Sequence, residues 1–291
     1  MLELLSPAGS MDSLMAAVQN GADAVYMGYG DFNARRNAKN FTEADFASAV
    51  SYCHLRGVKV YLTLNPLLTD RELPPAADLA RRASEIGADA VLVQDLGVLR
   101  AVRQVAPDLP VHASTQMTVH SLDGVKLCAD LGMKRAVLSR ELPADQIEYI
   151  CQHSPIEIEV FGHGALCMCY SGQCFFSALV GGRSGNRGMC AQPCRLNYGW
   201  GQTADKPLLS LKDMSLAKHL QELEEMGYKL VIHPLGTILH EAYTMNRFYK
   251  EYKEKGTTKD LFLEGIFEKR QVYQDILGYS EAMALREKYK T

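Results

Sequence analysis

The chain has 291 residues, of which 47% are hydrophobic and 22% charged, and its formal net charge is −3. This composition is typical of a folded, core-forming protein and excludes a collagen-like, coiled-coil or disordered chain. No apolar run approaches the ~20 residues of a membrane-spanning helix, and the N-terminus lacks the basic and apolar regions of a signal peptide. We therefore predict a cytoplasmic protein, in which RNA binding would need a local basic patch.

One pattern repeats along the chain: an amphipathic helix, then a glycine, then a short strand rich in Val, Ile and Leu. A glycine just past a helix supplies the left-handed residue that ends it, and continuously apolar strands are typical of a parallel sheet buried on both faces. Ser10 is expected to cap a helix through Asn20, and Thr42 to open another that ends before Gly57. The predicted strands are Glu3–Leu5, Ala24–Met27, Val58–Leu64, Ala90–Gln94, Pro110–Ala113, Ala136–Ser139, Ile156–Val160 and Lys229–His233.

Eight strands alternating with helices in fewer than 300 residues predict an α/β fold, a single (β/α)8 TIM-type barrel over residues 1–291. The active site of such a barrel lies at the C-terminal ends of its strands. The longest connection, a cysteine-rich loop over residues 162–207, follows the seventh strand. We therefore expect it to lie over the barrel mouth.

Five of the eight cysteines fall within this loop, at Cys167, Cys169, Cys174, Cys190 and Cys194. A disulfide framework is not expected in a chain without a secretion signal, whereas thiolates are soft ligands for zinc, copper(I) or iron–sulfur clusters. Structural zinc sites usually contain two tight cysteine pairs, and only the last two of these cysteines form one. The looser spacing favours an iron–sulfur cluster, with zinc as the alternative. The remaining cysteines, in helical patterns, are expected in the core: Cys53, Cys128 and Cys151.

Other polar side chains near the expected strand ends are candidates for substrate contact or catalysis. Arginines bind carboxylates and phosphates with two parallel hydrogen bonds, although a solvated loop would also contain them. The histidine that precedes the cysteines suggests either a Cys–His pair of a peptidase or a loop residue near a cluster. The substrate-binding candidates are Asn65, Gln116, Arg183, Arg187 and Arg195, and the catalytic candidates are His163, Arg140 and Glu141.

Residues 1 to 226 resemble the peptidase U32 family, also called collagenase-like peptidases. The resemblance rests on Glu3-Leu-Leu-Ser-Pro-Ala-Gly9, Gly21-Ala-Asp-Ala-Val-Tyr26, Leu138-Ser-Arg-Glu-Leu142, and the block from Glu157 through Cys190-Ala-Gln-Pro-Cys-Arg195. It implies a [4Fe–4S] cluster bound by Cys167, Cys174, Cys190 and Cys194, with Cys169 outside the ligand set. It also implies hydroxylation, without dioxygen, of transfer RNA, ribosomal RNA or a small aromatic substrate, with prephenate as hydroxyl donor in some relatives. Peptidase activity is the alternative that the family name implies.

Residues 227–291 depart from that family, whose final strand usually carries an Ile-Glu-Gly-Arg type motif. The tail is instead similar to the C-terminus of the phosphoenolpyruvate mutase and isocitrate lyase superfamily, on the basis of Lys255-Gly-Thr-Thr258 and Gly278-Tyr279. Residues 228–234 are still expected to form the closing strand. Two helices are expected, at 241–255 and 274–289, which either pack on their own barrel or join a second subunit in a homo-oligomer. The replaced motif leaves an inactive or scaffold barrel as a third functional hypothesis.

Overall fold

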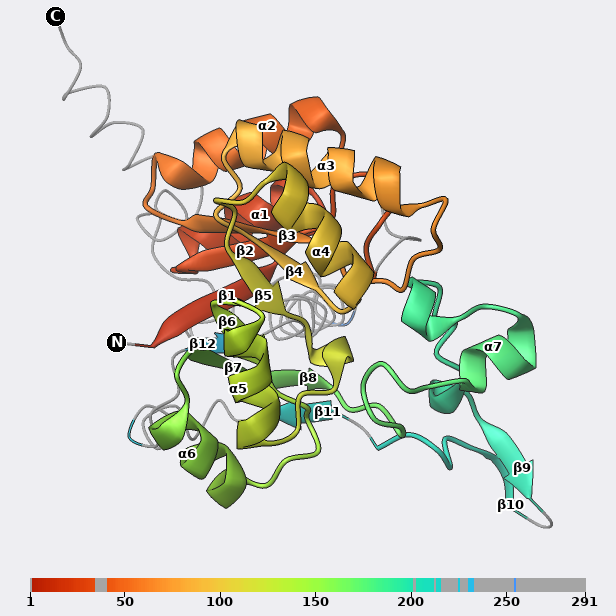
Figure 1. Cartoon of the computed structure of the whole chain (residues 1–291). Coiled ribbons are helices and arrows are strands. Elements are labelled where there is room, and N and C mark those ends of the chain that lie inside the picture. The colour runs from red at the N-terminus through yellow and green to blue at the C-terminus, as the bar shows by residue number, and fades with distance from the viewer. Residues whose placement is uncertain are drawn as a thin grey trace, which may run out of the picture.

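The computed structural model describes residues 2–34, 41–200, 203–211, 213–215, 225, 230–232 and 254. From the N-terminus to Phe161, parallel strands alternate with helices that pack around them (Figure 1). The predicted α/β class with a parallel sheet is confirmed. The elements of this part are β1 (Glu3–Pro7), α1 (Met11–Gln19), β2 (Ala24–Met27), α2 (Glu43–His54), β3 (Lys59–Thr63), α3 (Leu73–Ile86), β4 (Ala90–Val93), α4 (Leu96–Val105), β5 (Val111–Ala113), α5 (Leu122–Asp130), β6 (Arg135–Val137), α6 (Ala144–His153) and β7 (Glu157–Phe161).

Strands β1 to β7 pair in parallel, each with the next in the chain. The short strand β12 (Leu230–Ile232) pairs in parallel with both β7 and β1, so the strand order closes on itself. It lies within the predicted closing strand, residues 228–234. The sequence predicts two helices after this strand and a homo-oligomer contact through them. These helices lie outside the described residues, apart from residue 254.

Local sequence accounts for the ends of these elements. The Ser10 hydroxyl accepts a hydrogen bond from the Ser13 amide and caps α1, while Thr42 caps α2 in the same way through Asp45. Gly87, with φ at +112°, provides the left-handed residue that ends α3. These capping residues confirm the helix starts and one of the glycine stops that the sequence predicts.

The main core lies between the strands and the helices, and a smaller apolar cluster that includes Leu5 and Leu92 fills the barrel. Cys53 and Cys128 are buried in the main core, and Cys151 packs against it partly exposed, as their helical positions predict. Burial raises the pKa of Cys53 to about 11, so this thiol stays protonated and inert. No helix in the described part of the chain is long and apolar enough to cross a membrane.

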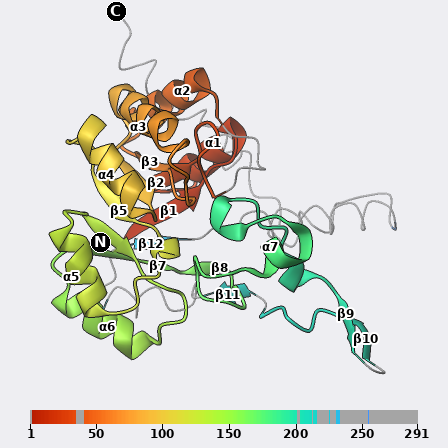
Figure 2. The ribbon, with the colours of Figure 1, turned by 45° about the vertical axis from the view of Figure 1, so that its right-hand side comes forward.

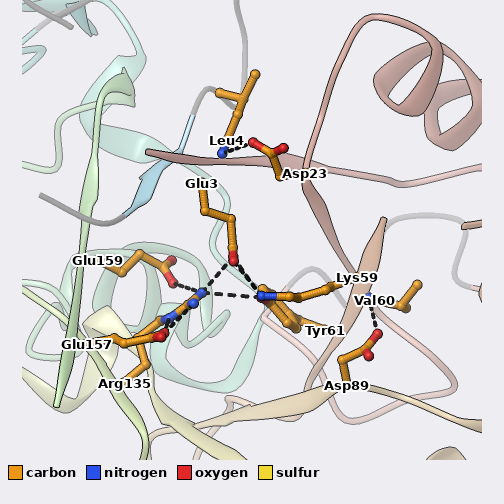
Figure 3. A network of polar contacts seen from close by, with 10 residues as sticks. All are labelled: Glu3, Leu4, Asp23, Lys59, Val60, Tyr61, Asp89, Arg135, Glu157 and Glu159. Atoms are coloured by element: carbon orange, nitrogen blue, oxygen red, sulfur yellow. Dashed lines mark hydrogen bonds and ion pairs between the residues drawn. The ribbon is translucent and has the colours of Figure 1, made fainter. Parts of the chain in front are cut away.

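The barrel interior also contains charged side chains near the N-terminal ends of the strands (Figure 3). Arg135, only 4% exposed, donates to Glu3 Oε1 at 3.0 Å and to Glu157 Oε2 at 2.5 and 2.8 Å. Lys59 and Tyr61 also donate to the Glu3 carboxylate, at 2.8 and 2.7 Å. The interior of this sheet is therefore not uniformly apolar, contrary to the pattern expected for strands buried on both faces.

The cysteine-rich segment follows β7 and folds beside the barrel. Strand β8 (His163–Ala165) pairs antiparallel with β11 (Asp213–Ser215), outside the barrel sheet. Figure 2 shows the short helix and the hairpin between them projecting to one side of the barrel. They are α7 (Phe176–Gly181), β9 (Tyr198–Trp200) and β10 (Thr203–Lys206). Two short 3-10 turns lie in the same segment, at Gly185–Arg187 and Pro193–Arg195, and a third, at Thr115–Met117, follows β5.

Candidate functional site

Hydrogen bonds hold the cysteine-rich segment against the C-terminal ends of several barrel strands. The main-chain carbonyl of Asn186 accepts from the Leu67 amide at 2.9 Å, after β3, and from Gln94 Nε2 at 3.1 Å, after β4. The Thr118 hydroxyl, after β5, donates to the Ser171 carbonyl at 2.6 Å. These contacts place the segment at the end of the barrel where the sequence predicts the active site.

Two glycines let the segment approach the barrel closely. Gly172 has φ at +79°, and a Cβ there would meet the carbonyl oxygen of Gln116. Gly188 has φ at +74°, and a Cβ there would meet the carbonyl oxygen of Asn33. A left-handed backbone pressed against another main chain is a place that only glycine fits without strain.

All five cysteines of the segment are free thiols, and they lie close enough to influence one another. The pKa of Cys169 is raised by burial, then by a hydrogen bond with Cys174 and the nearby Cys167 and Cys194. The pKa of Cys194 is raised by burial and by Cys167, Cys190 and Cys174, with Arg195 acting in the opposite direction. The cysteines of the segment therefore lie near one another, and nothing in these contacts separates Cys169 from the four predicted ligands.

The donor set fits an iron–sulfur cluster by its chemistry. Within the described residues, no three His, Cys, Asp or Glu side chains are grouped closely enough to hold a metal ion, so the geometry does not choose between zinc and a cluster. A [4Fe–4S] cluster distributes four cysteine thiolates over four irons. Five free thiols on one segment supply enough ligands for it.

The catalytic candidates occupy different positions. Arg140, just after β6, donates from Nη2 to Cys167 Sγ at 3.2 Å and so joins the cysteine cluster. His163 is buried at the start of β8, while Glu141 is exposed. Arg140 therefore contacts a predicted ligand, whereas the adjacent Glu141 faces solvent.

A group of neutral polar side chains is buried at the barrel mouth. Asn65, after β3, accepts from the Ala34 amide at 3.0 Å and donates to the Ser114 hydroxyl at 3.2 Å. The Ser139 hydroxyl and Gln116 Oε1 are buried without a hydrogen-bond partner among the described residues. Three mouth residues were not among the predicted site residues: Gln94, Ser114 and Ser139. Their position within two residues of a strand end was the available signal.

The three candidate arginines mainly contact the protein itself. Arg187 forms an ion pair with Glu72 at 2.7 Å and donates to the Leu67 carbonyl at 3.0 Å. Its hydrogen bonds lower the pKa of Glu72 to about 2. Arg195 donates to the Leu166 carbonyl at 3.3 Å, and Arg183 to the Met189 carbonyl at 3.2 Å. Arg187 therefore anchors the segment to the start of α3, a partner that the sequence did not reveal.

Comparison with known proteins identifies the family. The family model described as peptidase family U32 matches residues 9–276. The chain belongs to this family. The match continues beyond residue 226, where the sequence alone placed the end of the resemblance.

Among curated relatives, the 23S rRNA 5-hydroxycytidine C2501 synthase of Escherichia coli (strain K12) is 43% identical over 234 residues, covering 78% of this chain and 35% of that protein. The tRNA hydroxylation protein P1 of Bacillus subtilis (strain 168) is 35% identical, over 86% of this chain and 62% of that protein. This U32 chain thus spans between about a third and two thirds of the length of these relatives.

Among solved structures, a phosphoenolpyruvate phosphomutase from Streptomyces platensis subsp. rosaceus matches with a TM-score of 0.56 at 13% identity. The match covers 99% of this chain and 95% of the phosphomutase. At that identity the likeness shows the fold alone.

Proposed function

We propose that this chain is the catalytic barrel of an enzyme that hydroxylates a base of ribosomal or transfer RNA without dioxygen. In this proposal a full (β/α)8 barrel holds a [4Fe–4S] cluster through Cys167, Cys174, Cys190 and Cys194. The observation that carries it is the position of the cysteine segment, which is hydrogen-bonded to the strand ends where barrel enzymes keep their active sites. U32 relatives named for rRNA and tRNA hydroxylation support the substrate class.

The neutral mouth suits a nucleobase as the bound group. Gln116 Oε1 and the Ser139 hydroxyl, which have no partner among the described residues, offer an acceptor and a donor to the edge of a base, and single-stranded bases can be splayed into such a site. When bound, the cluster would supply one-electron redox chemistry. The chain's own contribution is to orient the base and to exclude water. Arg183 and Arg195 are candidates for the RNA phosphate or for the carboxylates of a hydroxyl donor such as prephenate.

The cluster is tested by anaerobic purification with iron, sulfide and zinc assays and an absorption spectrum. We expect a brown protein with about four irons per chain. Cys167→Ala, Cys174→Ala, Cys190→Ala or Cys194→Ala should each bleach or destabilise the centre, while Cys169→Ala, the matched control, should not. A colourless protein with one zinc per chain would replace the cluster with a structural zinc site, and bleaching by Cys169→Ala alone would overturn the ligand assignment.

The activity is tested by incubating the loaded protein anaerobically with unmodified RNA and prephenate, followed by mass spectrometry of the nucleosides. A gain of one oxygen on a pyrimidine, absent with the Cys190→Ala variant, is the expected result. Cleavage of gelatin by metal-free protein, with no change in the RNA, would favour the peptidase alternative. A loaded protein inactive in both assays would favour the scaffold hypothesis. The cytoplasmic location stays a prediction.

A further inference from the structure

Arg140 joins three parts of the site through one side chain. Its Nη1 donates to the Ala165 carbonyl at 2.5 Å, at the end of β8. Its Nη2 donates to Cys167 Sγ at 3.2 Å and to the Ser171 hydroxyl at 3.0 Å. The guanidinium carbon also lies 5.2 Å from the centre of the Phe161 ring. The planar fork of an arginine is suited to such simultaneous contacts, whereas a lysine ammonium is not.

The partners of Arg140 are themselves fixed to the barrel. The Ser171 carbonyl accepts from the Thr118 hydroxyl at 2.6 Å, and the next residue, Gly172, is pressed against the main chain of Gln116. Arg140 lies in the loop just after β6, separated from it by Leu138 and Ser139, and Ala165 is held by the pairing of β8 with β11. These contacts with the barrel therefore fix the position of the guanidinium beside the Cys167 sulfur.

We propose that Arg140 is a positioning residue that orients Cys167 and raises the reduction potential of the cluster. This inference rests on the proposed function. A hydrogen bond and a positive charge at a ligating sulfur stabilise the form of the cluster that has gained an electron, because that form is the more negative one. Arg140 is then not required to touch the RNA or the hydroxyl donor, in contrast to the catalytic role considered from the sequence.

The test compares anaerobically loaded wild type with the Arg140→Lys and Arg140→Met variants. Iron content is measured first, and the midpoint potential is then obtained by an anaerobic redox titration followed by absorption. The control is Arg183→Met, because Arg183 lies in the same segment and donates to the Met189 carbonyl. We expect about four irons in every protein, a lower potential for Arg140→Met, a partial recovery with Arg140→Lys, and no shift for Arg183→Met.

An Arg140→Met protein that binds iron at an unchanged potential would overturn the inference while leaving the proposed cluster intact. Loss of iron from both Arg140 variants, while circular dichroism shows that they are folded, would also overturn it. Arg140 would then only hold the segment in place. A wild-type protein that binds no iron would refute the proposed function itself, and the inference with it.

Discussion

The buried ion pairs inside the barrel make a quantitative prediction for Arg135→Met. The Glu157 partner of Arg135 is 55% exposed, so losing that contact costs little because water replaces it. The Glu3 carboxylate is 16% exposed and keeps Lys59 and Tyr61, but loses one charged hydrogen bond. Glu159, fully buried, loses its nearby cation at 3.7 Å.

Removing one partner of a buried ion pair typically costs about 3–5 kcal/mol. Burial raises the pKa of Glu159 to about 8, so this carboxyl can stay protonated near neutral pH and limit the loss. We therefore expect Arg135→Met to lower the free energy of unfolding by about 3 kcal/mol, at the low end of that range. Against a typical total of ~5–15 kcal/mol, this is a large fraction.

The assay is equilibrium unfolding in urea, followed by circular dichroism at neutral pH. Arg81→Met is the matched control, because Arg81 also forms two ion pairs, both at 2.6 Å, but its side chain is 43% exposed on α3. Surface pairs contribute little, so the control should unfold close to wild type. Equal losses of stability in the two variants would refute the reasoning that burial determines the cost.

Two further predictions concern Glu159 and Gly172. Because burial raises the folded-state pKa of Glu159 to about 8 from an ordinary 4.5, its contribution to stability is fully present below about pH 4.5 and is lost as the pH rises through 8. Glu159→Gln should therefore flatten the fall in thermal midpoint between about pH 5 and 8, and an unchanged slope would contradict this. Gly172→Ala should cost ~1–3 kcal/mol in strain and speed proteolysis of the cysteine segment. Gly182→Ala, also at positive φ but with open space around the added Cβ, should have a smaller effect, and equal proteolysis of the two would count against the close approach.

The sequence predicts the sheet well because the apolar strand pattern is local. The strand Ala24–Met27 has the predicted bounds, and the other strands up to β7 differ by one or two residues at an end. The charged interior was missed because apolar runs were assumed to face a core on both sides. The alternation in Glu157-Ile-Glu-Val-Phe161 was the signal, since it directs every second side chain into the barrel.

For the cysteine segment, the sequence leads to a hypothesis about its chemistry, which stays a prediction, but not to its shape. Spacing and residue type indicate a cluster, because thiolate chemistry belongs to the residues themselves. The pairing of β8 with β11, and the Arg187–Glu72 ion pair, join residues far apart in the chain. A single sequence carries no local pattern for such contacts, so neither partner could be chosen in advance.

The two ends of the barrel interior differ in the kind of polar group that they bury, charged at one end and neutral at the other. At the N-terminal end, the pKa of Glu3 stays below its usual value despite burial because Arg135 and Lys59 donate to it, whereas neither carboxylate oxygen of the buried Glu159 has a hydrogen-bond partner among the described residues. At the mouth, hydroxyl and amide groups such as Ser139 and Gln116 are buried with hydrogen-bonding capacity that the described residues do not use. An unused buried polar group costs stability, and a bound molecule that completed the hydrogen bonds of Ser139 and Gln116 would recover that cost. That molecule would meet the sulfur atoms at the same end of the barrel, since Arg140 and Thr118 fix the cysteine segment there.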